Sequence, residues 1–195
     1  MKKIFTAVIA GAMMLIGTSA FGQASIGAGL VMPMNTGANL LSSGTETTTL
    51  SGFYAGPNYN IGFGNSGLGL APGVYFNYAT KSANNIDRKQ MYLSAPVMLN
   101  LGLQLTPGFV IRPYAGPTFA YGLKDEISGA VITTDWYNND NYNRFNIQVG
   151  GGIAFEFYDM VRFDAGYDYG LTKIYDTTAG SLTKNQFHVG VAYIF

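Results

Sequence analysis

The sequence contains no cysteine, which excludes disulfide bonds, thiolate metal sites and a lipid anchor attached through cysteine. Charge is scarce as well: charged residues make up 11% of the 195-residue chain, about half the share of an ordinary soluble domain. Basic and acidic residues are equal in number, 11 of each, so no basic surface for nucleic acid is expected. The composition therefore points away from thiolate-metal proteins and from nucleic-acid-binding proteins.

Long hydrophobic runs are missing beyond the first 22 residues. The chain opens with two lysines, continues without charge to Gly17 and then reaches small residues at Ala20 and Gly22. These are the three parts of a secretory signal peptide. The apolar stretch is shorter than the ~20 residues of a membrane-spanning helix, so we expect cleavage after Gly22 and no anchor helix. The predicted domains are a signal peptide, residues 1–22, and a mature domain, residues 23–195.

The mature chain is nevertheless apolar, because hydrophobic residues make up 48% of the sequence and aromatic residues 14%. In an apolar chain without apolar runs, hydrophobic and polar residues must alternate. This pattern makes one face of a strand apolar, since successive side chains of a strand point to opposite faces. In 187–195 the odd positions are all large and apolar. In 91–105 the leucines fall on alternate positions, and a helix would spread them around its whole circumference. This pattern is typical of a transmembrane β-barrel.

Eight segments show the alternation, and each is long enough to cross a bilayer as a tilted strand of about 9–11 residues. They are residues 26–34, 53–63, 68–78, 91–105, 109–121, 145–157, 161–171 and 187–195. Three short connections alternate with four long and polar ones, namely 65–66, 106–108 and 158–160 against 35–52, 79–90, 122–143 and 172–184. Short periplasmic turns and long external loops are the layout of an outer-membrane barrel.

The predicted fold class is all-β: a transmembrane antiparallel up-and-down β-barrel of eight strands in the Gram-negative outer membrane, reached after export across the inner membrane. The last strand should pair with the first, because a sheet edge in hydrocarbon leaves backbone groups unpaired. One alternative is a ten-stranded barrel, in which 35–52 and 123–141 contribute an extra hairpin. The other is a soluble β-sandwich or lipocalin-like barrel, which requires charged outer faces that these strands lack.

The outward face of the last strand is the expected assembly signal, because it is apolar and ends on an aromatic carboxyl-terminal residue. Its members are Phe187, Val189, Val191, Tyr193 and Phe195. The expected partners are therefore outer-membrane lipid and, through this strand, the barrel-assembly machinery. A protein partner at the external loops is a further expectation.

Inward positions carry six charged residues, three of each sign, and these form a predicted polar network in the lumen. They are Arg112, Arg144, Glu156, Arg162, Asp164 and Asp168. The short turn at 158–160 keeps the apolar faces of its two strands on the same side. This alternation places Glu156 opposite Arg162. The network either neutralises itself and fills a narrow interior or lines a passage for ions or small solutes, and we favour the first because eight strands leave room only for side chains.

The single histidine, His188, is also expected in the lumen, near the external end of the last strand. A lipid-modifying enzyme would need a nucleophile or an acid within hydrogen-bond reach of it. Ser181 and Asp168 are the only partners that the sequence offers. We favour a lumen histidine that is hydrogen-bonded to its neighbours.

Two patterns that look like ligand sites are rejected. Gly62 to Gly67 matches G-x-G-x-x-G, but it lies on a strand-to-strand turn and offers no helix terminus to a dinucleotide. Residues 135–141 gather oxygen donors, but their spacing does not match a helix-flanked calcium loop. We therefore expect no cofactor, no metal and no catalytic residue.

Several short motifs occur in an order that resembles a known family. They are Met91 to Pro96, Pro113 to Pro117, Gly150 to Ile153, Tyr167 to Leu171 and the ending on Phe195. Together they are similar to the outer-membrane β-barrel domain common in Bacteroidota, the grouping that includes PorT-like proteins. The resemblance spans most of residues 24–195 and implies the same barrel, with a role around protein secretion in the PorT-like members. Relatives often carry an acidic residue near Ser94, which this chain lacks.

The leading functional hypothesis is a non-enzymatic outer-membrane protein with a structural, adhesive or envelope-assembly role through its external loops. A narrow channel for ions or small solutes is the first alternative. A lipid-modifying outer-membrane enzyme is the second.

Overall fold

A computed structural model describes residues 22–38, 45–64, 66–83, 86–129, 133–138, 142–177 and 180–195. These residues form thirteen strands and one short 3-10 helix. The elements are β1 (Gly22–Ala38), β2 (Thr45–Thr49), β3 (Ser51–Gly62), β4 (Leu68–Pro72), β5 (Tyr75–Ala83), β6 (Ile86–Leu101), β7 (Leu103–Thr106), β8 (Phe109–Ser128), β9 (Thr133–Asp135), η1 (Trp136–Asn138), β10 (Phe145–Phe157), β11 (Val161–Gly170), β12 (Lys173–Thr177) and β13 (Gly180–Ile194).

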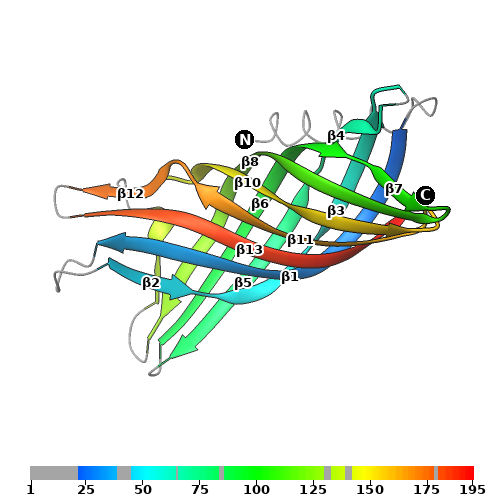
Figure 1. The fold of residues 1–195 in the computed structure, drawn as a ribbon. Coiled ribbons are helices and arrows are strands. Elements are labelled where there is room, and N and C mark those ends of the chain that lie inside the picture. Colours follow the sequence, from blue (N-terminus) through cyan, green and yellow to red (C-terminus); the bar gives the residue numbers. More distant parts are fainter. Residues whose placement is uncertain are drawn as a thin grey trace, which may run out of the picture.

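All thirteen strands belong to one antiparallel sheet, in which successive passes of the chain along the barrel are neighbours. The sheet closes on itself because β13 pairs with β1, from Ser25 opposite Ile194 to Gly37 opposite Leu182. Figure 1 shows the result, a long barrel with the first and last strands side by side. The predicted pairing of the last strand with the first is confirmed.

The thirteen strands make eight passes along the barrel, because several are separated only by a short break. Leu50 alone separates β2 from β3, Gly102 alone separates β6 from β7, and two residues lie between β4 and β5 and between β11 and β12. The three-residue β9 pairs only with the end of β8. The segments considered for an extra hairpin therefore lengthen existing passes, and the all-β up-and-down prediction holds.

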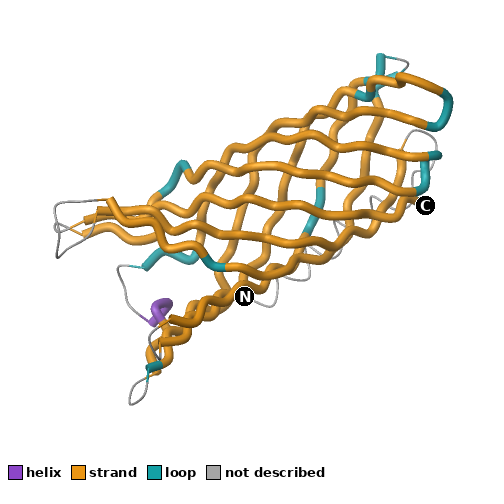
Figure 2. Tube along the Cα trace, turned by 60° about the horizontal axis from the view of Figure 1, so that its bottom comes forward, coloured by secondary structure: helices purple, strands orange, loops and turns teal. Residues whose placement is uncertain are grey.

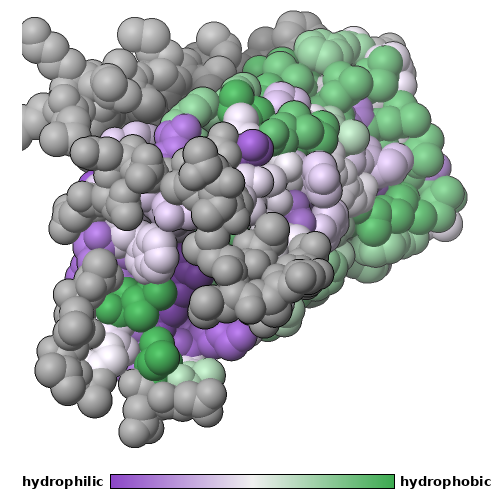
Figure 3. Space-filling view, turned by 90° about the vertical axis from the view of Figure 1, so that its left-hand side faces the viewer, coloured by the Kyte–Doolittle hydropathy of each residue, from purple (hydrophilic) through white to green (hydrophobic). Residues whose placement is uncertain are grey.

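The outer wall of the barrel is apolar. The exposed large hydrophobic residues include Phe163, Tyr167 and Tyr169 on β11 and Phe187, Val189, Val191 and Tyr193 on β13, each between 39% and 55% exposed. In contrast, Gln148, Glu156 and Asp168 are fully buried. This reverses the arrangement of a soluble β-barrel, so the soluble alternative is excluded. Figure 3 shows hydrophobic residues along the barrel wall and hydrophilic residues gathered at the end nearest the viewer.

The long connections were predicted as loops, and this prediction is wrong for most of their described residues. In 79–90, β5 and β6 stay paired as far as Ala83 opposite Ile86. In 122–143, β8 continues to Ser128, and β1 and β2 pair within 35–52. Outside the bilayer neither strand face needs to be apolar, so these strands continue without the alternation that marks the others.

The strand ends beyond the apolar wall form two extensions, which Figure 2 shows as two arms at one end of the barrel. The first extension consists of the outer ends of β12, β13, β1 and β2, and the second of the outer ends of β5, β6 and β8 with β9. The other end has short turns, including one in which Tyr158 and Asp159 both have positive φ, 52° and 55°. Tight turns mark the periplasmic end, so the extensions are external.

Three predictions fall partly outside the described residues. The predicted signal peptide lies outside them except for Gly22, the first residue of β1. Asn65 of the first short turn and residues 139–141 of the rejected calcium loop are also outside them. Within the described ranges, no helix is both long and apolar enough to cross a membrane.

Candidate functional site in the barrel lumen

Large polar side chains fit inside the barrel because glycines face them from neighbouring strands. A Cβ atom added to Gly152 or to Gly166 would lie 2.5 Å from the hydroxyl of Tyr114. Tyr54 lies in the same way against Gly190 of β13. These glycines create the space in which the tyrosines and charged side chains cross the lumen.

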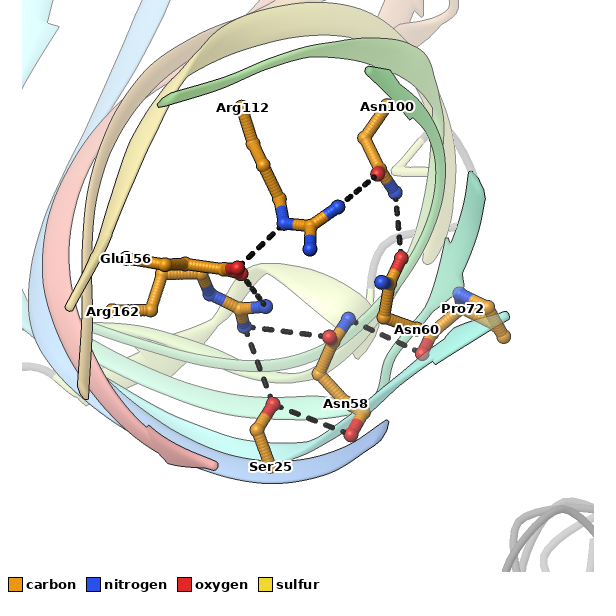
Figure 4. A network of polar contacts seen from close by, with 8 residues as sticks. All are labelled: Ser25, Asn58, Asn60, Pro72, Asn100, Arg112, Glu156 and Arg162. Carbon is orange, nitrogen blue, oxygen red and sulfur yellow. Dashed lines mark hydrogen bonds and ion pairs between the residues drawn. The ribbon is translucent and has the colours of Figure 1, made fainter. Parts of the chain in front are cut away.

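A layer of three charged residues lies toward the periplasmic end. Glu156 is opposite Arg162 in the β10–β11 pair, as face parity predicted. Arg112 Nε donates a hydrogen bond to Glu156 at 2.6 Å, and Arg162 lies 3.9 Å from the other carboxylate oxygen. The carboxylate is 2% exposed and the arginine side chains 16% and 12%. One buried carboxylate thus serves two guanidinium groups (Figure 4).

Neutral side chains hold the two guanidinium groups on their other sides. Arg112 donates to the amide oxygen of Asn100 at 3.3 Å. Arg162 donates to the Ser25 hydroxyl and to the Asn58 amide oxygen, both at 3.3 Å. The layer therefore spans the barrel from β8 to β1, and Figure 4 shows its members converging from opposite walls.

The second layer lies in the middle of the barrel and is acidic. His188 Nδ1 lies 3.7 Å from Asp168, His188 Nε2 lies 4.0 Å from Asp164, and the same Nε2 is 3.1 Å from the Tyr114 hydroxyl. Tyr54 donates to Asp164 at 3.3 Å. The structure thus brings His188 and two of the predicted lumen carboxylates together.

His188 lies halfway along the barrel, between Val31 and Gly166, so its predicted place near the external end of β13 is wrong. Ser181 cannot be its partner, because it lies seven positions away along an extended strand, a distance of about 23 Å. Within the part of the chain that the structure describes, no cluster of metal-binding side chains is found.

Between the two layers lies a cavity of about 100 Å³. Its lining includes Asp164, Asp168, Arg112 and Arg162. Toward the outside it ends where Tyr92 donates a 2.7 Å hydrogen bond to Gln186. Immediately beyond, the amine of Lys184 lies 3.1 Å from the centre of the Tyr92 ring, and both residues are buried.

A third cluster holds the external mouth together. Asp125 is fully buried and receives two hydrogen bonds from Arg88, at 3.0 and 2.8 Å, one from Gln90 at 2.8 Å and one from Tyr142 at 2.7 Å. Burial and the adjacent Asp125 carboxylate raise the pKa of Tyr142 far above its usual value, so its hydroxyl remains a donor. The Trp136 ring packs against Tyr142. This cluster ties η1 and β8 together over the lumen.

Arg144 was predicted to join the lumen network; the structure places it on the inward side, but at the external mouth and apart from the charged layers. It precedes β10 at the external end, where its guanidinium lies over the Tyr137 ring, 4.6 Å from the ring centre. It donates to the backbone carbonyls of Leu123 and Tyr137. Its inward direction agrees with the alternation of β10, in which Asn146 and Gln148 also face inward, but it lies too far toward the outside to reach the charged layers.

The Asp125 cluster and Lys184 were missed by sequence reasoning. Alternation continued from the outward residue Leu123 would place Asp125 on the outward face. The β6–β8 register shifts between Met91 and Tyr92, however, and Asp125 faces inward. Lys184 was assigned to a loop, although it lies on the inward parity of Gln186 and His188. Extending that parity toward the external end would have found it.

A closed antiparallel sheet with an apolar outer wall and a charged interior defines a transmembrane β-barrel of the bacterial outer membrane. The family model described as outer membrane protein beta-barrel domain matches residues 22–176. The chain belongs to this family and lies in the Gram-negative outer membrane.

Solved structures of other outer-membrane proteins have the same fold. Ail, the attachment invasion locus protein of Yersinia pestis, is 16% identical with a TM-score of 0.52, covering 90% of this chain and 99% of that one. Neisserial surface protein A is 16% identical with a TM-score of 0.51, covering 88% and 99%. OprG from Pseudomonas aeruginosa is 13% identical with a TM-score of 0.50, covering 90% and 96%. A search of the curated proteins by sequence gave no match.

Proposed function

We propose that this protein is a non-enzymatic, non-conducting barrel whose external extensions bind a protein partner, as an adhesin or as a subunit of an envelope assembly. One observation carries the proposal: side chains fill the lumen in successive layers, while the sheet continues well past the apolar wall. The interior is arranged to support the wall, and the extensions present the surface that is available for contact.

The lumen layers argue against free passage of solutes. The cavity ends at Tyr92 and Gln186, and Lys184 lies directly beyond them. The Asp125 cluster then joins strands around the external mouth. A solute would have to break buried, charge-assisted hydrogen bonds to cross, each of which contributes about 1.5–3 kcal/mol.

The extensions support a binding role through their backbone as well as their side chains. Among the described strands, β2 pairs only with β1, so the other edge of Thr45–Thr49 has no strand neighbour. An open edge presents unpaired amide and carbonyl groups to which an extended segment of a partner can add. The described side chains of β2 are threonines, which favour strand pairing.

Crosslinking on intact cells tests this role. The compared variants lack either residues 38–45, which connect β1 with β2 in the sequence, or residues 129–132, which connect β8 with β9. A matched control replaces Asp159 in a periplasmic turn with Asn. We expect at least one crosslinked protein to disappear with an external deletion and to persist in Asp159→Asn. If both deletions keep every crosslink while the barrel remains folded, the adhesive and assembly roles are wrong.

In the second form of the proposal, the partner belongs to a protein-secretion assembly. Its support is the order of motifs shared with PorT-like proteins, together with the external extensions. The crosslinked protein would then be a secretion component, and deletion of an extension would reduce secretion.

The cavity between the layers is the observation that favours a narrow channel instead. It is lined by charged groups and reaches the arginine layer. Opening it outward would require displacing Tyr92 and Lys184. The lipid-modifying alternative has less support, because His188 faces the lumen and so points away from the lipid that it would have to modify.

A further inference from the structure

The cavity between the two lumen layers has walls of opposite charge. Its periplasmic wall contains Arg112 and Arg162, and the wall toward the outside contains Asp164 and Asp168. Within the described part of the chain, Glu156 alone pairs with the two guanidinium groups, so the arginine wall keeps one positive charge in excess. No described arginine or lysine forms an ion pair with either aspartate, and the second wall is therefore acidic.

The arginine wall still has hydrogen-bond donors to offer. A guanidinium group carries five N–H groups in a planar fork. Arg112 uses Nε for Glu156 and Nη1 for Asn100, and its Nη2 forms no hydrogen bond to a described residue. Arg162 makes its hydrogen bonds to described residues through Nη2 alone. Both guanidinium groups point toward the middle of the lumen (Figure 4), so their remaining N–H groups are placed to bind a carboxylate.

The acidic wall has an acceptor left over as well. Asp164 accepts a hydrogen bond from Tyr54 through Oδ2, and the same oxygen is the one nearest to His188. Its other oxygen, Oδ1, accepts no hydrogen bond from a described residue. The Asp164 side chain is 18% exposed although it faces inward and lines the cavity, so its exposed surface lies in the lumen. An ammonium group is a donor that suits such a carboxylate oxygen.

The spacing of the charges and the size of the cavity restrict the ligand to a small molecule. Arg162 and Asp164 are two residues apart on the same face of β11, so their Cα atoms are separated by about 6.6 Å. The cavity measures about 100 Å³. A cavity of about 150 Å³ accommodates benzene, so this one suits a somewhat smaller molecule. A small α-amino acid is of this size and carries both of the required charges.

The surroundings of the cavity favour entry from the periplasm. Toward the outside, the cavity is closed by Tyr92 and Gln186, with Lys184 directly beyond them. Toward the periplasm, Gly102 lies beside the Arg112 guanidinium, and a Cβ atom added to this glycine would lie 2.7 Å from Nη1. Since Gly102 has no side chain, it leaves the guanidinium uncovered at that position.

We propose that the lumen cavity binds a small α-amino acid in its zwitterionic form, with the carboxylate at Arg112 and Arg162 and the ammonium group at Asp164. Each charge of the ligand then meets the wall of opposite charge through charge-assisted hydrogen bonds. A molecule with only one of the two charges leaves one wall without a partner. Because the external side stays closed, the site binds without conducting, and it does not depend on the partner role of the extensions.

Isothermal titration calorimetry of the folded full chain in a nonionic detergent tests the proposal, with glycine as the zwitterionic probe. Acetate and methylamine are the matched probes, because each keeps one charged group of glycine and lacks the other. We expect wild type to bind glycine at least about tenfold more tightly than either of them. This comparison uses wild type alone, so it decides the matter even if a variant fails to fold.

The variant Asp164→Asn tests the acidic wall, because it keeps the shape of the side chain and removes its charge. Its affinity for glycine should fall about tenfold. The matched control is Asp159→Asn, which removes an exposed carboxylate from a periplasmic turn outside the cavity and should bind glycine as wild type does. Heat-modified gel migration verifies that each protein is folded.

Three results would overturn the proposal. The first is the absence of glycine binding to folded wild type. The second is equal affinity for glycine and for methylamine or acetate, which would assign the cavity to simple cations or anions. The third is an unchanged affinity in folded Asp164→Asn or an equal loss in Asp159→Asn, since either would mean that Asp164 does not recognise the ammonium group.

Discussion

Removing the carboxylate of Glu156 should destabilise the barrel strongly, because it leaves two buried guanidinium groups without a counter-charge. Arg112 and Arg162 keep only neutral partners in that variant, namely Asn100 for the first and Ser25 and Asn58 for the second. Breaking a buried ion pair from one side costs about 3–5 kcal/mol. The adjacent cavity can admit water to the arginines, so we expect the lower end, about 3 kcal/mol, for Glu156→Ala.

Equilibrium urea unfolding in lipid vesicles measures this loss, with the fluorescence of Trp136, the sole tryptophan, as the probe. Glu156→Gln keeps an acceptor for Arg112 and should lose about half as much. Glu126→Ala is the matched control, because it removes a partly exposed, ion-paired carboxylate that lies outside the charged layers; little change is expected there. A loss below about 1 kcal/mol for Glu156→Ala would refute the reasoning that this carboxylate neutralises the arginine layer.

Three further predictions concern packing, the external mouth and assembly. Gly166→Ala places a methyl group against Tyr114 and His188, so the free energy of unfolding should fall by about 1–3 kcal/mol; wild-type stability would contradict the close packing. Tyr142→Phe removes a donor to buried Asp125, so we expect a loss of about 1.5–3 kcal/mol and faster hydrogen exchange at the external mouth, at residues 142–146 and 172–175. Unchanged exchange would mean that the cluster does not hold the mouth. Deletion of Phe195 removes the aromatic end of the predicted assembly signal, and the heat-modifiable folded fraction in outer membranes should decrease; equal folded fractions would exclude that role.

The transmembrane part of the fold was predictable because the bilayer forces a strict alternation on it. Every outward position in the wall must be apolar, so the faces of β10, β11 and β13 could be assigned from sequence. The same parity correctly placed Glu156 opposite Arg162. Residue contacts across a hairpin follow from register, which a tight turn fixes.

The external extensions and the Asp125 cluster could not be predicted in this way. Water satisfies polar groups on either face of a strand outside the bilayer, so β2 and the outer ends of β5 and β6 carry no period-2 signal. Asp125 meets Arg88 across 37 residues, and a register shift reverses the parity between them. Such a bulge is a local backbone feature that alternation cannot reveal.

Single-channel conductance of the folded, purified protein in a planar bilayer tests the central claim most directly. The layered lumen predicts no steady openings from protein whose insertion and folding are verified in the same preparation. Reproducible openings at a constant conductance would contradict the claim. They would mean that Tyr92 and Lys184 leave a continuous passage, and the channel would then replace the binding role as the leading function.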